Sequence, residues 1–111
     1  AHVTPDTFYD QVLESDFPAY MEFGTEMCYG CQMMKEDLAK LAPEFEGTLF
    51  IGEFDVDSDG GEIAGRYINT MTLPGTVCFY KGQKLYSDYG YAGDIDDLRD
   101  DLLYCASMAE E

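Results

Sequence analysis

Apolar residues recur along the chain with two periods, and the change between these periods marks helices and strands. Spacings of three and four residues predict a helix from near Cys28 to about Phe45. Short apolar runs rich in aromatic and β-branched residues predict strands at residues 18–24, 48–56, 76–80 and 84–91, with a stub at 1–3. Further helices are predicted at 3–15, 60–68 and 94–108, the middle one weak because it contains Gly65.

The boundaries of these elements carry recognisable signals. Thr4 followed by Pro5 suits the start of a helix, and Asp94 suits the N-cap of the last one. Pro43 should loosen the final turn of the long helix. The three-residue connection 81–83, which contains Gly82, predicts a hairpin between the last two strands.

The order of elements is α-β-α-β-α-β-β-α, which indicates an α/β domain. Strands separated by helices are expected to run parallel, and the hairpin adds an antiparallel edge. The chain has 111 residues, enough for one hydrophobic core, so we expect a single domain over residues 1–111.

Composition and charge exclude several classes of function. Apolar residues make up 46% of the chain, which is typical of a folded protein, and the net charge is −17. Such a chain repels phosphate backbones and anionic lipids, so we expect neither nucleic-acid binding nor a role at a lipid surface. No apolar run approaches the roughly 18 residues of a transmembrane helix, so we expect no membrane insertion. Solvation in a salty environment and steering toward basic partners explain the charge equally well, and neutral drift within a family is a third explanation. No signal-peptide pattern is visible and the chain starts at Ala1 rather than Met, so the compartment stays open.

Cys28 and Cys31 stand two residues apart, between a predicted strand and the start of a helix. Unpaired amides and the dipole at a helix N-terminus favour a thiolate, the nucleophile of thiol–disulfide exchange. Cys78 and Cys105 lie in apolar segments, and we interpret them as buried thiols. A disulfide between them stays open, since the sequence gives no distances. A four-cysteine metal site is disfavoured because 27 positions separate this second pair.

The segments "YMEFGTEMCYGC" and "FDVDSDGGEIAGRYINTMTLPGTVCFYKGQ" make the chain resemble the thioredoxin superfamily, over about residues 7–105. The resemblance implies a three-layer sandwich with a central mixed sheet and helices on both faces. It also implies a redox-active Cys-Tyr-Gly-Cys motif, in which Cys28 attacks and the buried Cys31 resolves the mixed disulfide. Pro74 would be a cis-proline facing the pair, and the backbone of Leu73 would bind a substrate segment as an added strand.

Glu22 stands six residues before Cys28, where members of this superfamily often hold a buried acid. Independently, a carboxylate between aromatic residues of a central strand is costly to bury in its charged form. We therefore expect a raised pKa that suits a proton acceptor for Cys31, with a solvated glutamate as the alternative.

Several residues depart from the superfamily pattern. Met27 replaces the usual Trp, and Tyr29 and Gly30 replace Gly-Pro between the cysteines. These three residues flank the pair, and we expect them to contact the substrate and tune the thiols. Glu53 occupies the place of a lysine that commonly neighbours the buried acid. Glu36 replaces a helix-kinking Pro, and Gly75 replaces a Thr after the cis-proline.

Two other features of the sequence suggest different chemistry, a calcium site and a hydrolase. The run Asp55, Asp57, Asp59 and Gly60 matches the first half of an EF-hand loop, but Arg66 stands where its bidentate Glu belongs. We interpret the run as a solvated turn in which Asp59 caps the next helix. His2 is the only histidine, and its terminal position leaves no base for a Cys-His hydrolase.

The sequence therefore predicts a thiol–disulfide oxidoreductase that reduces or exchanges protein disulfides. A disulfide oxidase or isomerase is one alternative, and a non-catalytic binding module with the same fold is another. The expected partners are protein disulfides and a reductase or thiol electron donor. We expect no cofactor, no metal and a monomer. A cytoplasmic location is expected, with a periplasmic or secreted one left open.

Overall fold

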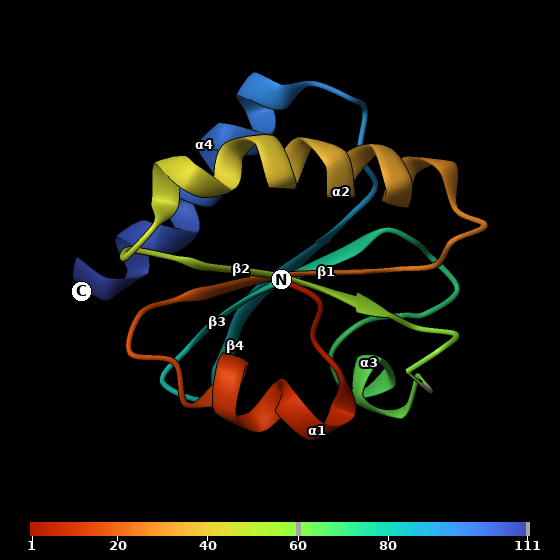
Figure 1. The fold of residues 1–111 in the computed structure, drawn as a ribbon, viewed down its shortest axis with the longest axis horizontal. Helices are drawn as coiled ribbons and strands as arrows, with labels where there is room; N and C mark the ends of the chain where they lie inside the picture. Colours follow the sequence, from red (N-terminus) through yellow and green to blue (C-terminus); the bar gives the residue numbers. More distant parts are fainter. Residues whose placement is uncertain (60, 111) are drawn as a thin grey trace.

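Four strands form one sheet with helices on both faces (Figure 1). The computed structural model describes residues 1–59 and 61–110. The strands are β1 (Ala19–Gly24), β2 (Phe50–Asp55), β3 (Gly75–Tyr80) and β4 (Gln83–Tyr89). The helices are α1 (Pro5–Phe8), α2 (Tyr29–Leu41), α3 (Glu62–Tyr67) and α4 (Ile95–Ser107). In the described part of the chain, no helix is long and apolar enough to span a bilayer.

The sheet has the order β2-β1-β3-β4, in which β1 and β2 run parallel and the other two strand pairs are antiparallel. The predicted stub at residues 1–3 makes an isolated parallel bridge, between His2 and Glu53 of β2. The expectation that every helix joins parallel strands is wrong for β3, which is antiparallel to β1. Phe23 of β1 pairs with Phe54 near the end of β2 and also with Gly75 at the start of β3. The connection through α3 therefore returns the chain to the end of the sheet where β2 finishes, instead of carrying it back along the face of the sheet.

The hairpin between β3 and β4 is one residue tighter than the sequence suggests. Gln83 already pairs with Tyr80, so the turn consists of Lys81 and Gly82 alone. Both residues have positive φ, 53° and 80°, as a two-residue turn that follows the twist of the strands requires.

The helix signals are largely confirmed. Thr4 is the N-cap of α1 and Pro5 its first residue, and the same helical segment continues as a π-helical turn over Tyr9–Leu13. The long helix changes to a 3₁₀ turn at Ala42–Phe45, where Pro43 breaks the α-helical pattern. The side chain of Asp94 accepts hydrogen bonds from two amides in the first turn of α4.

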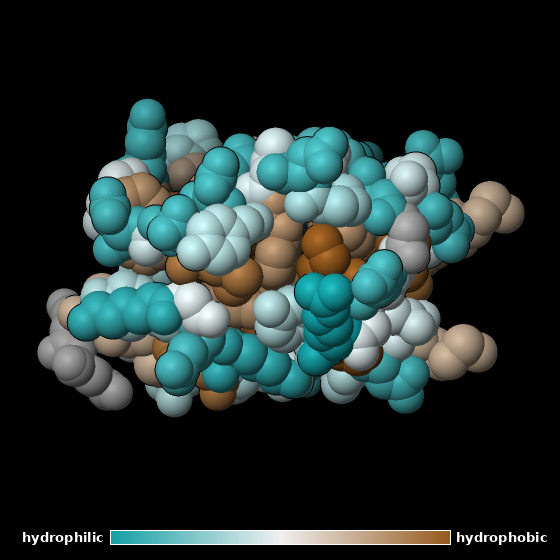
Figure 2. All heavy atoms as spheres, turned by 90° about the horizontal axis from the view of Figure 1, so that it is seen from below, coloured by the Kyte–Doolittle hydropathy of each residue, from teal (hydrophilic) through white to brown (hydrophobic). Residues whose placement is uncertain are grey.

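Alternate residues of β1 face opposite sides of the sheet. Ala19, Met21 and Phe23 belong to the apolar core beneath α1 and α3. Tyr20 belongs to the core beneath α2 and α4, and Glu22 follows it on the same face. Figure 2 shows the α1 and α3 side from outside, where hydrophobic residues near the middle of the view interrupt a mostly hydrophilic surface.

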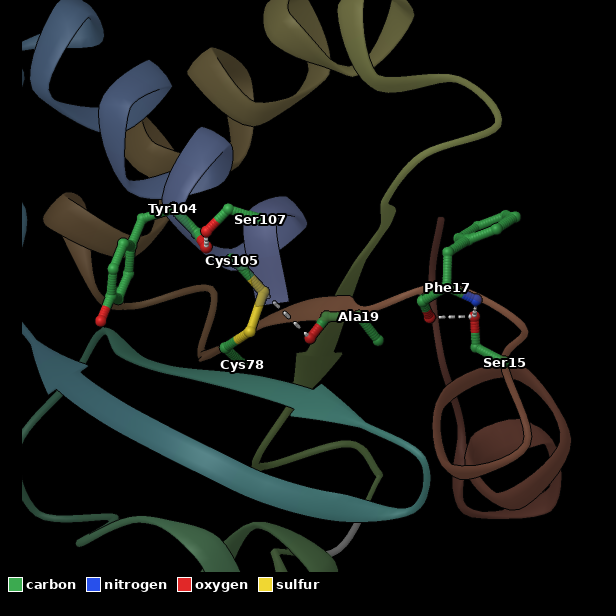
Figure 3. The surroundings of a disulfide bond; sticks show 7 residues. All are labelled: Ser15, Phe17, Ala19, Cys78, Tyr104, Cys105 and Ser107. Atoms are coloured by element: carbon green, nitrogen blue, oxygen red, sulfur yellow. Dashed lines mark hydrogen bonds between the residues drawn. A yellow bond between two sulfur atoms is a disulfide. The ribbon is translucent and has the colours of Figure 1, made fainter. Parts of the chain in front are cut away.

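A disulfide between Cys78 and Cys105 ties β3 to α4 (Figure 3). Both residues are fully buried, as predicted, but the interpretation as free thiols is wrong. The Cα atoms of the pair lie 5.8 Å apart. Cys105 Sγ also lies 3.8 Å from the carbonyl oxygen of Ala19, at the start of β1. This disulfide therefore lies at the end of β1 opposite to Gly24 and the other two cysteines.

Candidate active site

Cys28 is the N-cap of α2, in the connection that follows β1. Its backbone is extended, and its Sγ accepts a hydrogen bond from the amide of Cys31 at 3.2 Å. The connection is anchored because the side-chain amide of Gln32 donates to the carbonyl of Thr25 at 2.9 Å. The sulfur that caps the helix thus lies among its unpaired amides, where negative charge is stabilised.

Cys28 and Cys31 form a disulfide, and their Cα atoms are 5.2 Å apart. The two sulfurs differ in access, because Cys28 is half-buried while Cys31 is only 1% exposed. An incoming nucleophile or substrate can therefore reach Cys28 more readily than Cys31. Because all four cysteines are paired two by two, a four-cysteine metal site has no free ligands.

The peptide bond between Leu73 and Pro74 is cis, as the resemblance implies. Pro74 is buried opposite the cysteine pair, since a Cβ placed on Gly30 would lie 3.5 Å from Pro74 Cδ. Leu73 is half-buried. In the described part of the chain, no hydrogen bond engages its backbone amide or carbonyl. An extended peptide could pair with these free groups.

Three large apolar residues near the pair or its facing loop are exposed, and we call them the exposed apolar rim: Met27 and Tyr29 flank Cys28 in the sequence, and Met71 lies in the segment that leads to Pro74. Their side chains are 91%, 82% and 90% exposed. Met34, in contrast, is buried in the core beneath α2 and α4. Exposure of large apolar side chains to water is unfavourable, so their burial against a partner would favour binding at this place.

Glu22 is buried beneath α2, with 3% of its surface exposed. Its Oε2 atom has no hydrogen-bond partner among the described residues. Burial is the main cause that raises the pKa of Glu22, to about 8, and the neighbouring charge of Glu53 acts in the same direction. The alternative of a solvated glutamate is therefore excluded. A carboxyl group that titrates near neutrality suits proton transfer.

Gly24 allows Glu22 and Cys31 to approach one another. A Cβ at Gly24 would collide with Glu22 Oε2 and would come within 2.7 Å of Cys31 Sγ. The carboxyl and the sulfur therefore face the same small space, close enough for one bridging water. A similar argument explains Gly75, where a Cβ would lie 2.8 Å from Ile68 Cδ1.

One pair at the site was not recognised in the sequence. Lys35 Nζ lies 3.4 Å from Glu53 Oε1, and Glu53 stands beside Glu22 in the parallel register of β1 and β2. Lys35 lies one turn beyond Cys31 on α2, and this spacing was the only signal that could have identified it.

The aspartates that resemble an EF-hand form a turn. Asp55 Oδ1 accepts hydrogen bonds from the amides of Asp57 and Ser58. Asp59 Oδ2 accepts from the amide of Asp55, so Asp59 does not cap α3 as predicted. Gly60 lies outside the described residues. Among the described residues, no group of three or more His, Cys, Asp or Glu side chains could hold a metal ion.

Two clefts open on the α2 and α4 side of the sheet. The one of about 390 Å³ runs from Glu22 to the surface between α2 and β2. The other, of about 470 Å³, lies between β4 and the start of α4. It is lined by four aspartates, which are Asp88, Asp94, Asp97 and Asp101. Only the first cleft reaches the buried acid.

Comparison with known proteins agrees with this geometry. The family model for thioredoxin matches residues 1–103. The chain is 29% identical to thioredoxin 1 of a Nostoc species, over 77% of this chain and 78% of that one. It is 29% identical to a thioredoxin of Mycolicibacterium smegmatis, over 88% of both chains. It is also 31% identical to a bifunctional thioredoxin reductase/thioredoxin of Mycobacterium leprae, over 88% of this chain and 21% of that protein. With its Cys28–Cys31 pair at a helix start, this chain belongs to the thioredoxin family of thiol–disulfide oxidoreductases.

Proposed function

We propose that the protein reduces disulfide bonds in other proteins through Cys28 and Cys31. The observation that carries the proposal is the unequal access of the two sulfurs. Cys28 caps α2 at the surface, and Cys31 is buried next to Glu22. This is the arrangement that a two-step exchange requires, with one sulfur to attack and one to resolve.

The reaction starts from the reduced dithiol. The Cys28 thiolate attacks a substrate disulfide, forms a mixed disulfide and releases the first substrate thiolate. Cys31 then attacks Cys28 Sγ, which breaks the mixed disulfide and releases the second thiolate. Two electrons pass to the substrate, and the protein is left with the Cys28–Cys31 disulfide seen in the structure. Glu22 accepts the proton that Cys31 loses in the second step.

The substrate segment is proposed to bind across the exposed rim. Its backbone pairs with Leu73 beside Pro74, and its side chains contact Met27 and Tyr29, while Gly30 leaves the approach to the sulfurs open. The free backbone groups of Leu73 and the exposed apolar rim support this placement. The adaptable thioether of Met27 suits varied sequences.

Electrons for further rounds are proposed to come from a reductase or a small thiol. The relative from Mycobacterium leprae carries a thioredoxin reductase in the same chain, which supports a partner of this class. The exchange itself uses only cysteine sulfur and protons, so we propose that it needs no bound cofactor. We propose that the chain acts as a monomeric single domain, with its exposed rim kept for substrates.

The Cys78–Cys105 disulfide favours a second candidate function. A buried disulfide far from the active pair persists mainly in oxidising compartments. This supports a periplasmic or secreted location over the cytoplasmic one expected from the sequence. In such a compartment the same pair can run in the opposite direction, as an oxidase or isomerase.

Reduction of insulin by dithiothreitol tests the proposal. The wild type should accelerate insulin precipitation, and Cys28→Ala should abolish the acceleration. Cys31→Ala should accumulate a mixed disulfide with substrate, visible by mass spectrometry. Wild-type protein that gives no acceleration would instead support the non-catalytic binding module.

Equilibration of the Cys28–Cys31 pair with glutathione separates the two directions. A reduction potential near −270 mV, on the order of a reducing thioredoxin, supports the reductase. A potential near −120 mV, on the order of a strong oxidant, would reject it in favour of the oxidase.

A further inference from the structure

Two carboxylates lie side by side beneath α2. Glu22 of β1 and Glu53 of β2 are Cα partners in the parallel register, so both side chains point to the same face of the sheet. Glu22 is buried and its Oε2 has no hydrogen-bond partner among residues 1–59 and 61–110, whereas Glu53 is half-buried and paired with Lys35. Two acids this close influence one another's ionisation.

The cation of this cluster comes from the helix that carries the resolving cysteine. Lys35 stands one turn after Cys31 on α2 and reaches down to Glu53, with an Nζ to Oε1 distance of 3.4 Å. Its side chain is about half exposed, so it lies at the boundary between the buried acid and solvent. The residue beside Glu22 in β2 is thus an acid, Glu53, and the lysine comes from α2 and not from β2.

The cleft of about 390 Å³ connects this cluster with solvent. Its lining includes Glu22, Glu53 and Lys35, together with the charged or titratable groups Asp55 from the end of β2, Glu26 from the β1–α2 connection and His2 from the N-terminal segment. The uncharged Thr76 of β3 stands on the other side of Glu22. Among these groups, Glu53 is the register partner of Glu22, and Lys35 is ion-paired with Glu53.

We propose that Lys35 and Glu53 are positioning residues that together set the pH at which Glu22 takes the proton of Cys31. The proposal rests on the proposed exchange reaction. When Cys31 attacks Cys28 Sγ, its proton moves to the Glu22 carboxylate, and the cleft then returns that proton to water. Glu53 opposes the charged form of Glu22, and Lys35 favours it.

The electrostatics agree with this geometry. Burial and the charge of Glu53 raise the pKa of Glu22, while Lys35 lowers it. Asp55 also raises this pKa, but it contributes less than the other three influences. Removal of either member of the Lys35–Glu53 pair should therefore move the titration of Glu22, and the two removals should move it in opposite directions.

Titration of the Glu22 side-chain carboxyl by ¹³C NMR tests the proposal directly. The oxidised protein is used, so that no thiol titrates. Lys35→Met should move the midpoint to higher pH and Glu53→Gln to lower pH, each by on the order of half a pH unit, because the half-exposed pair is partly screened. Lys35→Arg keeps the positive charge and should stay near the wild-type midpoint. Lys40→Met, which removes another exposed lysine of α2, is the matched control and should leave the midpoint unchanged.

Kinetics of the resolving step provide the second measurement. The pH profile for release of substrate thiol from the mixed disulfide should shift with the NMR midpoint in both variants. Midpoints that stay unmoved, or that move in the same direction, would overturn the role of this pair even if the wild type reduces insulin normally. Wild-type protein without insulin reduction would instead overturn the proposed function, whatever the titration shows.

Discussion

Replacement of Glu22 by Gln should change how the stability of the fold depends on pH. The folded state raises the pKa of Glu22 from an ordinary 4.5 to about 8. Between these two values the folded protein keeps a proton that the unfolded chain releases. The free energy of unfolding must therefore fall as pH rises through this window, and the fall ends above the folded pKa.

The size of the effect follows from the same two values. When the folded state binds one proton more than the unfolded chain, the free energy of unfolding falls by about 1.4 kcal/mol per pH unit. Glu22 should therefore lower the free energy of unfolding by about 4 kcal/mol between pH 5 and pH 8. Gln keeps the shape of the side chain but does not ionise. The variant should lack this slope, although its buried amide lowers stability by a pH-independent amount.

Urea unfolding of the oxidised protein, followed by circular dichroism from pH 5 to pH 9 at constant ionic strength, measures the effect. The free energy of unfolding of Glu22→Gln should rise steadily relative to that of the wild type as pH increases to about 8. Glu36→Gln removes an exposed carboxylate of α2 and should follow the wild-type curve. If the free energy of unfolding of wild type and of Glu22→Gln changed with pH in the same way, the conclusion that Glu22 is buried in its protonated form would be refuted.

Three further changes test other parts of the structure. Gly24→Ala should lower stability by about 1–3 kcal/mol in urea unfolding and slow the resolving step, because the added methyl collides with Glu22 and comes within 2.7 Å of the Cys31 sulfur. Joint replacement of Cys78 and Cys105 by Ala should lower the free energy of unfolding by about 3–4 kcal/mol, given a sequence separation of 27, while insulin reduction persists below the new melting temperature. Met27→Asp should leave stability within about 0.5 kcal/mol and slow reduction of protein disulfides, but not of small aromatic disulfides, in a comparative rate assay.

The elements of the fold could be predicted because their signals are local. The spacing of apolar residues on α2, Pro43 near its end and the capping Asp94 each act within a few residues of the feature they control. The direction of β3 could not be predicted in this way. It depends on whether the short helix α3 carries the chain back across the sheet, which is a matter of tertiary geometry.

The active site was only partly predictable for a similar reason. The position of Cys28 and Cys31 between a strand and a helix can be identified from the sequence. The burial of Glu22 follows from its aromatic neighbours in β1. The Cys78–Cys105 and Lys35–Glu53 pairs join different elements across the fold, and nothing in the local sequence specifies which residues meet.

The alternation of side chains along β1 has a consequence for the way this strand tolerates variation. Ala19, Met21 and Phe23 face an apolar core without reactive groups, whereas Glu22 and Gly24 face the buried sulfur. Neighbouring positions of β1 therefore affect different properties of the protein, the stability of the core at one and the chemistry of the sulfur at the next. In a library of β1 variants, changes at the odd positions should lower the melting temperature in step with activity. Changes at the even positions 22 and 24 should alter the rate of exchange by more than the change in melting temperature accounts for.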